Sequence, residues 1–239
     1  MNKKLLGIAF AAAFTTSAAQ ATVIDDFSGV AFSGDASLAG AAAGSSSAGY
    51  TRTVDATTSG ADTTVTINDG AALGLYGHSQ SVGVTGWSQI NFDLGGIDLT
   101  EGGTLNALRI GLDSVDLNGI IGIVIDGITS SLTTNAILTA NGLTTPSFAD
   151  YLFTDFGAVD LTNVSTLSLF IDGNGQTALD ASISILETTC SGLNASGGSG
   201  VNGSSGSCGS TSVPEPGTLL LLGLGLAGMA GIRRKKLSV

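Results

Sequence analysis

The sequence predicts an all-β fold, a β-sandwich or jelly roll, for the body of this 239-residue chain. Thr, Ser, Val and Ile are abundant and 36 residues are glycine, whereas the strong helix formers Lys, Glu and Gln are scarce. Short runs of alternating apolar and polar residues recur between turn-forming Gly, Asn and Asp residues. Many short strands separated by frequent turns are typical of sandwiches and jelly rolls.

The first 21 residues have the features of a secretory signal peptide, which we expect to form a signal helix before its removal. Lys3 and Lys4 supply the positive start, residues 5–14 are apolar, and Ala19 and Ala21 form a small-x-small cleavage site. We therefore expect export through the Sec translocon, cleavage after Ala21, and a folded domain over residues 22–190.

Six segments of this domain alternate with period two and predict strands. They are residues 63–68, 88–94, 107–112, 122–125, 166–172 and 181–187. In the last segment the alternation predicts Ile183 and Ile185 on one face and Ser184 on the other. A short helix is expected near residues 146–153.

Five Asn- or Asp-containing pairs or triplets that end in glycine predict the tight turns between strands, because these residues tolerate positive φ. They are residues 68–70, 118–119, 126–127, 141–142 and 172–173.

Charge is distributed unevenly. Residues 22–214 contain eighteen acidic residues against two basic ones, Arg52 and Arg109, a net charge of −16. Such a domain repels nucleic acid and anionic membranes, so we expect no nucleic-acid partner. Many of these acids need serve only solubility.

The same acids attract hard cations, so calcium is the candidate cofactor, although no motif requires one. A calcium site is expected at Asp25 or Asp26 together with Asp180 if the first and last strands are neighbours.

Cys190 and Cys208 are the two cysteines of the chain, and an even count in an exported protein predicts one disulfide. They flank a Gly/Ser-rich segment, residues 191–212, that has the composition of a flexible linker. Closing this loop would contribute about 3 kcal/mol in the chain-entropy model. Free thiols remain the alternative.

The C-terminal segment, residues 213–239, has three parts in order: Val213-Pro214-Glu215-Pro216, an apolar run over 218–232, and the basic cluster Arg233-Arg234-Lys235-Lys236. The apolar run predicts a transmembrane helix of about 22 Å, which is short for a hydrocarbon core of about 30 Å. The basic cluster is expected to stay in the cytoplasm as an anchor.

This segment resembles the PEP-CTERM sorting signal of Gram-negative bacteria. The resemblance implies recognition by an exosortase, with cleavage near Pro214-Glu215-Pro216 after a transient stay in the inner membrane. It also implies delivery to the cell surface or extracellular matrix, and an association with exopolysaccharide and biofilm formation.

A second resemblance is confined to short pieces at the two ends of the domain. Residues 23–28 and 179–185 are similar to the first and last strands of galactose-binding-like jelly rolls. This resemblance implies a jelly roll and does not by itself imply sugar binding.

The inventory of catalytic residues argues against an enzyme. Gly77-His78-Ser79-Gln80-Ser81 approaches the G-x-S-x-G nucleophile elbow, but its last glycine is replaced by serine. His78 is the only histidine of the chain, so Ser79 has no separate base, and we expect His78 to lie in a turn or on the surface.

The sequence therefore favours a non-catalytic extracellular matrix protein that associates with exopolysaccharide through bridging cations or shallow sugar recognition. One alternative is a carbohydrate-binding module whose aromatic platform is Trp87 or one of the tyrosines Tyr50, Tyr76 and Tyr151. The other, disfavoured by the inventory of catalytic residues, is a secreted hydrolase.

Overall fold

The computed structural model describes residues 21–35, 37–59, 63–69, 73–134, 136–137 and 146–191. They lie within the unit Ala19–Gly209, one of the two units into which the chain divides. The sorting segment and residues 1–20 of the signal peptide lie outside the described residues. No helix within the described ranges is long and apolar enough to cross a membrane.

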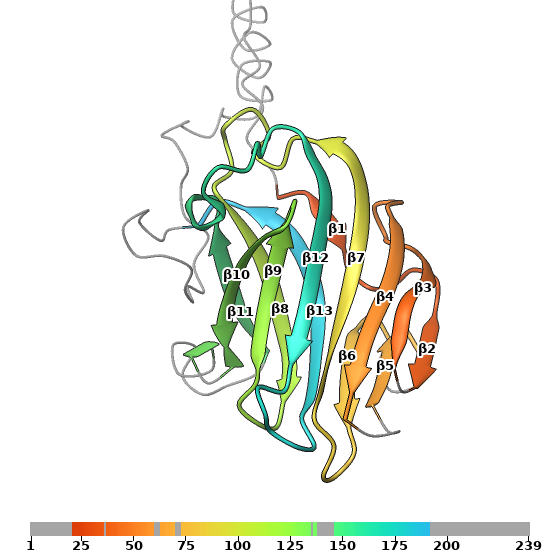
Figure 1. Ribbon diagram of the computed structural model, residues 1–239. Coiled ribbons are helices and arrows are strands. Elements are labelled where there is room, and N and C mark those ends of the chain that lie inside the picture. The colour runs from red at the N-terminus through yellow and green to blue at the C-terminus, as the bar shows by residue number, and fades with distance from the viewer. Residues whose placement is uncertain are drawn as a thin grey trace, which may run out of the picture. The chain divides into compact units, whose positions relative to one another are not determined.

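Within these residues thirteen strands form two antiparallel sheets, which confirms the predicted all-β sandwich (Figure 1). Sheet A has the order β11 (Ser147–Leu152), β8 (Ala107–Val115), β13 (Asp180–Thr189), β6 (Tyr76–Gln80), β5 (Thr63–Ile67), β2 (Phe32–Asp35), and β1 (Val23–Asp25) pairs with β13. Sheet B has the order β10 (Ile128–Thr133), β9 (Ile120–Ile125), β12 (Val164–Asp172), β7 (Gly86–Ile97), β4 (Thr51–Thr58), β3 (Leu38–Ser45).

The core forms from the inward-facing residues of both sheets. Ile90 and Phe92 of β7 and Leu108 and Ile110 of β8 are fully or almost fully buried in one cluster. The hydroxyl of Tyr151 on β11 donates a hydrogen bond to a backbone oxygen of β9, 2.8 Å away, and so links the two sheets. Because successive residues of a strand point to opposite faces, each sheet packs one face into this core and turns the other outward.

All six predicted strands are present, and several are longer than predicted. The turn between β9 and β10 uses Asp126 and Gly127 at φ 44° and 87°, as predicted. After β12 the positive φ values occur at Asn174 and Gly175, 51° and 77°, rather than at the predicted pair 172–173.

The predicted helix near residues 146–153 is wrong. Residues Ser147–Leu152 form β11, and only a single turn of 3₁₀-helix, η1 (Phe153–Phe156), follows. Ala149 and Tyr151 face the core and Phe148 faces outward, which is the alternation of a strand paired to β8.

The predicted common face of Ile183 and Ile185 is also wrong, because β13 carries a bulge. The register to β8 steps from Ile183↔Leu112 to Ile185↔Gly111, which leaves Ser184 outside the one-to-one pairing. The extra residue reverses the alternation, so that Ile183 and Leu186 are buried and Ile185 is only half-buried.

The N-terminal strand β1 belongs to sheet A and pairs with the last strand, β13. Val23 pairs with Glu187 in β13, so the predicted first and last strands are neighbours. Thr22 extends this pairing: its N–H donates to Thr188 Oγ1 at 3.0 Å, its carbonyl accepts from the Thr188 N–H at 2.9 Å, and its hydroxyl donates to Glu101.

Candidate functional site

His78 lies in the core and not in the turn or on the surface where we predicted it. It is 1 % exposed on β6, whose alternate residues Tyr76, His78 and Gln80 all point inward. A histidine in an alternating Tyr-x-His-x-Gln run was the signal for this inward face. We did not recognise this run as an inward face because its residues are polar, whereas buried strand faces are usually apolar.

A hydrogen-bonded chain satisfies His78. Its Nδ1 lies 2.7 Å from Ser88 Oγ on β7, which in turn lies 2.5 Å from the Tyr76 hydroxyl. Its Nε2 lies 2.7 Å from Gln80 Nε2, which also donates to the Gly86 carbonyl. In this orientation of the Gln80 amide its nitrogen donates to Nε2 of His78, which assigns the proton of the imidazole to Nδ1.

Burial lowers the pKa of His78 to about 4, although the charges of Asp180 and Asp172 oppose the shift. The imidazole is therefore neutral at pH 7. Ser79, the neighbouring nucleophile candidate, is exposed on the opposite face of β6 and lines a groove there. The strand thus separates the two groups that a hydrolase would have to join.

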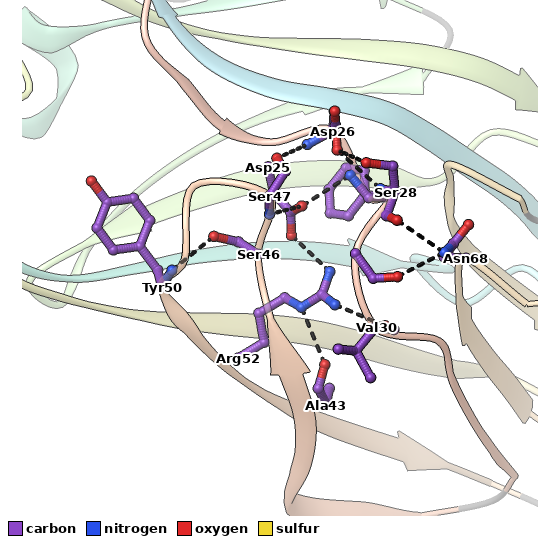
Figure 2. A network of polar contacts seen from close by, with 12 residues as sticks. Asp25, Asp26, Ser28, Val30, Ala43, Ser46, Ser47, Tyr50, Arg52 and Asn68 are labelled. Atoms are coloured by element: carbon purple, nitrogen blue, oxygen red, sulfur yellow. Dashed lines mark hydrogen bonds and ion pairs between the residues drawn. The ribbon is translucent and has the colours of Figure 1, made fainter.

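Asp25 and Asp26, two of the predicted calcium ligands, are engaged in other ways. Asp25 and Arg52 form an ion pair of 2.9 Å, and both side chains are 0 % exposed (Figure 2). The second oxygen of Asp25 accepts the N–H groups of Phe27 and Ser47, and Asp26 accepts from Ser28.

The third predicted ligand, Asp180, lies elsewhere. Asp25 pairs with Leu186, six residues along β13 from Asp180, a separation of about 20 Å. Within the described residues no group of three or more His, Cys, Asp or Glu side chains could hold a metal ion. The positive charge beside Asp25 comes from Arg52 instead.

Arg52 also donates to the carbonyls of Ala43 on β3 and Val30, which lies between β1 and β2, so its guanidinium joins these segments to Asp25 on β1 (Figure 2). Burial raises the pKa of Asp25, while Arg52 and the two backbone N–H groups oppose the rise. The pair fastens the N-terminal segment of sheet A to sheet B.

The other arginine of the domain is buried in the same way. Arg109 on β8 makes a bidentate pair with Asp150 on β11, at 2.7 and 3.0 Å, and is 7 % exposed. Hydrogen bonding to Asp150 raises the pKa of Arg109 further. Since residues 22–214 contain no other Lys or Arg, the exposed charged side chains of the described domain are all acidic.

The outward side of sheet B presents a regular array of side chains. β7 and its neighbours β4 and β12 lie side by side (Figure 1). The burial pattern shows that each strand directs every second residue outward. The register aligns them in four cross-strand rows, which we call the sheet B face. The rows are Thr51–Asp93–Thr166, Thr53–Asn91–Ser168, Asp55–Gln89–Phe170 and Thr57–Trp87–Asp172.

The two central rows are joined by side-chain hydrogen bonds. Asn91 Oδ1 accepts from both Gln89 Nε2 and Ser168 Oγ, and Asn91 Nδ2 donates to Asp55 at 2.6 Å. The other oxygen of Asp55 accepts the Gly40 N–H at 2.7 Å. This network fixes the amides and the carboxylate in one orientation, with a second Asn91 hydrogen left for another acceptor.

Two aromatic side chains border this network. Trp87 is half-buried at one end of β7 and lines a depression of about 360 Å³ with Thr57, Thr85 and Asp172. Phe170 lies over Gly122 of β9, where a Cβ atom would come within 2.3 Å of its ring. Glycine at 122 therefore allows the Phe170 ring to lie against the sheet.

Beside the aromatic residues the face is hollowed. A depression of about 580 Å³ lies over the rows that contain Asn91 and Asp93 and is lined mainly by Thr, Ser, Asn and Asp. A second groove, of about 400 Å³, lies on the outward side of sheet A between β5, β6, β13 and β8. Only the first of these hollows has the ordered amide network at its base.

Sequence reasoning found Trp87 but missed Asp55, Gln89, Asn91 and Ser168. The predicted strand 88–94 contains the alternating polar residues, so the outward side of β7 could have been inferred. The sequence could not show that β4 and β12 lie on either side of β7, because these pairings join residues that are far apart in the chain.

The structure leaves several predicted residues untested. Cys190 is half-buried against the core at the end of β13, but Cys208 lies outside the described residues, so their disulfide stays a prediction. Ala21 is exposed, whereas Ala19 and the C-terminal segment lie outside those residues too.

Two solved structures are similar to the domain. One is a family 11 carbohydrate-binding module from Clostridium thermocellum in complex with a β-1,3-1,4-mixed-linked tetrasaccharide, with 12 % identity and a TM-score of 0.37 over 72 % of this chain and 96 % of that chain. The other is the family 11 module of the cellulase Lic26A-Cel5E of the same organism, with 16 % identity and a TM-score of 0.36 over 72 % and 95 %. Both similarities are too low to support a statement about the ligand of this chain.

The sorting segment gives a direct match. No curated protein matches the chain, but residues 212–235 match the family model of the PEP-CTERM protein-sorting motif. The range includes Val213, Pro214, Glu215 and Pro216 and the basic residues up to Lys235, and Lys236 follows it. The chain therefore carries a PEP-CTERM protein-sorting motif at its C-terminal end, as the sequence predicted.

Proposed function

We propose that this chain is an exported, exosortase-processed, non-catalytic protein of the surface or extracellular matrix of a Gram-negative bacterium, and that its sheet B face binds exopolysaccharide. The sorting motif implies exosortase processing and transit toward the cell surface. The observation that supports binding is the hydrogen-bonded network of Gln89, Asn91, Asp55 and Ser168, with Trp87 and Phe170 in neighbouring rows at one end of it.

That combination suits sugars. Amides and carboxylates in fixed positions can each exchange hydrogen bonds with neighbouring hydroxyl groups, and an aromatic ring can cover the apolar face of a sugar. The face is shallow and open, which suits association with a polymer better than enclosure of a small substrate. The neutral, buried imidazole of His78 supports the non-catalytic part of the proposal.

The export part predicts the two ends of the mature protein. Mass spectrometry of the extracellular form should find Thr22 as the first residue and a C-terminus near Pro214-Glu215-Pro216. Thr22 is also where hydrogen bonding to the last strand begins. Recovery of the intact chain Met1–Val239 from the cytosol would contradict export.

The binding part predicts that Asn91→Ala weakens retention in polysaccharide-containing gels by about tenfold, because it removes the shared partner of Asp55, Gln89 and Ser168. Ser79→Ala, which also truncates a polar side chain to alanine but on the outward side of sheet A, should leave retention unchanged. Thermal melting of both variants checks that they are folded. Equal retention of wild type and Asn91→Ala would contradict the assignment of this face.

Two further experiments, the Trp87→Ala variant and the addition of a chelator, distinguish direct sugar recognition from binding through a bridging cation. Loss of binding in Trp87→Ala favours a specific carbohydrate-binding module with Trp87 as the platform. Loss of binding on addition of a chelator alone favours bridging by a divalent cation such as calcium.

A further inference from the structure

The sheet B face carries negative charge and no positive charge. Asp55, Asp93 and Asp172 belong to its twelve residues, and none of the twelve is basic. The two arginines of the domain are buried against Asp25 and Asp150, so neither can approach a ligand on this face.

From this charge distribution we infer that the ligand of the sheet B face is an uncharged polysaccharide, bound along the interior of its chain. The inference rests on the proposed function and adds the chemical class of the ligand. An anionic glycan would bring carboxylate or sulfate groups beside aspartates with no cation to compensate them, and like charges in contact oppose binding strongly.

A cationic glycan is the second class to consider, and the existing hydrogen bonds disfavour it. Asp55 already accepts from Asn91 and Gly40, and Asp172 accepts from the N–H of Asn174 at 2.7 Å. Both carboxylates therefore already accept hydrogen bonds from N–H groups of the protein. Asp93 is the exposed carboxylate of the face, and a single exposed charge attracts an ammonium group only weakly in water.

The shape of the face suits an extended chain. Trp87, Gln89, Asn91 and Asp93 follow one another on β7 at intervals of about 6.7 Å, so the four rows span about 20 Å, and the three strands span about 10 Å across. Polar groups therefore repeat along a strip, as the hydroxyl groups of a polymer do. The 580 Å³ hollow lies over this strip and is an open depression.

Matched derivatives of one polymer test the inference on the full chain, purified in mild detergent because of its apolar tail. A panel of soluble neutral glucans, mannans and galactans first identifies a polymer that binds by isothermal titration. Its hydroxyethyl, carboxymethyl and aminoethyl derivatives are then compared at equal substitution, so that they differ mainly in charge.

We expect the carboxymethyl derivative to bind roughly tenfold more weakly than the hydroxyethyl derivative at 10 mM ionic strength. The difference should narrow at 150 mM, where the screening length falls from about 30 Å to about 8 Å. Asp93→Asn should narrow it as well, whereas Asp113→Asn, which removes the same charge beside the groove on sheet A, should not.

The possible failures are distinguishable. If no polymer of any charge binds, or if binding is indifferent to Asn91→Ala, the proposed function fails. If a polymer binds through this face and its carboxymethyl derivative binds as tightly as the hydroxyethyl one, or only the aminoethyl derivative binds, the function stands and the inferred ligand class is wrong.

Discussion

Replacing Asp25 with asparagine should lower the free energy of unfolding by about 3–5 kcal/mol, because it leaves the buried guanidinium of Arg52 without a counter-charge. Asparagine keeps the shape of the side chain and one oxygen to accept the N–H groups of Phe27 and Ser47. The decrease in the free energy of unfolding therefore measures the effect of losing the charge pair. Urea denaturation followed by the fluorescence of Trp87, the only tryptophan, measures it.

Asp26 offers a matched control one residue away. Its side chain is more exposed and bonds locally to Ser28, so Asp26→Asn should cost less than about 0.5 kcal/mol. If Asp25→Asn is no more destabilising than Asp26→Asn, the ion pair does not fasten the N-terminal segment to sheet B.

Acidification from pH 8 to pH 5 should lower the free energy of unfolding by about 2 kcal/mol through His78 alone. Burial lowers the pKa of His78 from 6.5 to about 4 in the folded protein. Between those two values the unfolded chain binds a proton that the folded protein does not, so stability is complete above pH 6.5 and falls as the pH decreases toward 4.

The variant His78→Asn separates this contribution from those of the carboxylates. The introduced amide retains a donor for Ser88 but cannot titrate, so the stability of the variant should be lower at pH 7 and should change less between pH 7 and pH 5. Asp180 and Asp172, whose charges act on His78, are unchanged in both proteins. Identical pH profiles, measured by urea denaturation at each pH, would contradict the buried neutral imidazole.

The strands that were predicted are those whose alternation of apolar and polar residues is visible in the sequence. Strand β7 has apolar core residues on one side and polar residues on the other, and its pattern 88–94 was interpreted correctly. Strand β4 has the same alternation, but its inward residue at position 52 is an arginine, which is typical of a solvent-facing position. Strand β3 begins at Leu38 and continues with only Ala, Gly and Ser, so it has no apolar period to detect, and its pairing to β4 is irregular.

The candidate site was predicted less completely than the fold. Trp87 was identified by residue type, since aromatic side chains are rare in this chain. Asp55 and Ser168 acquire their role only when β4 and β12 lie on either side of Asn91, and no local pattern reports that pairing. Asp25 was predicted as a metal ligand because a carboxylate near the first strand can serve a cation, and the cation proved to be the side chain of Arg52.

Amide chemical shifts recorded during titration with a neutral polysaccharide that binds test the central claim most directly. We predict that the shifted residues cluster on β4, β7 and β12, with Asp55, Gln89, Asn91 and Ser168 among the most affected. Shifts that cluster instead on the outward side of sheet A, around Thr64, Ser79 and Ser182, would contradict binding at the sheet B face.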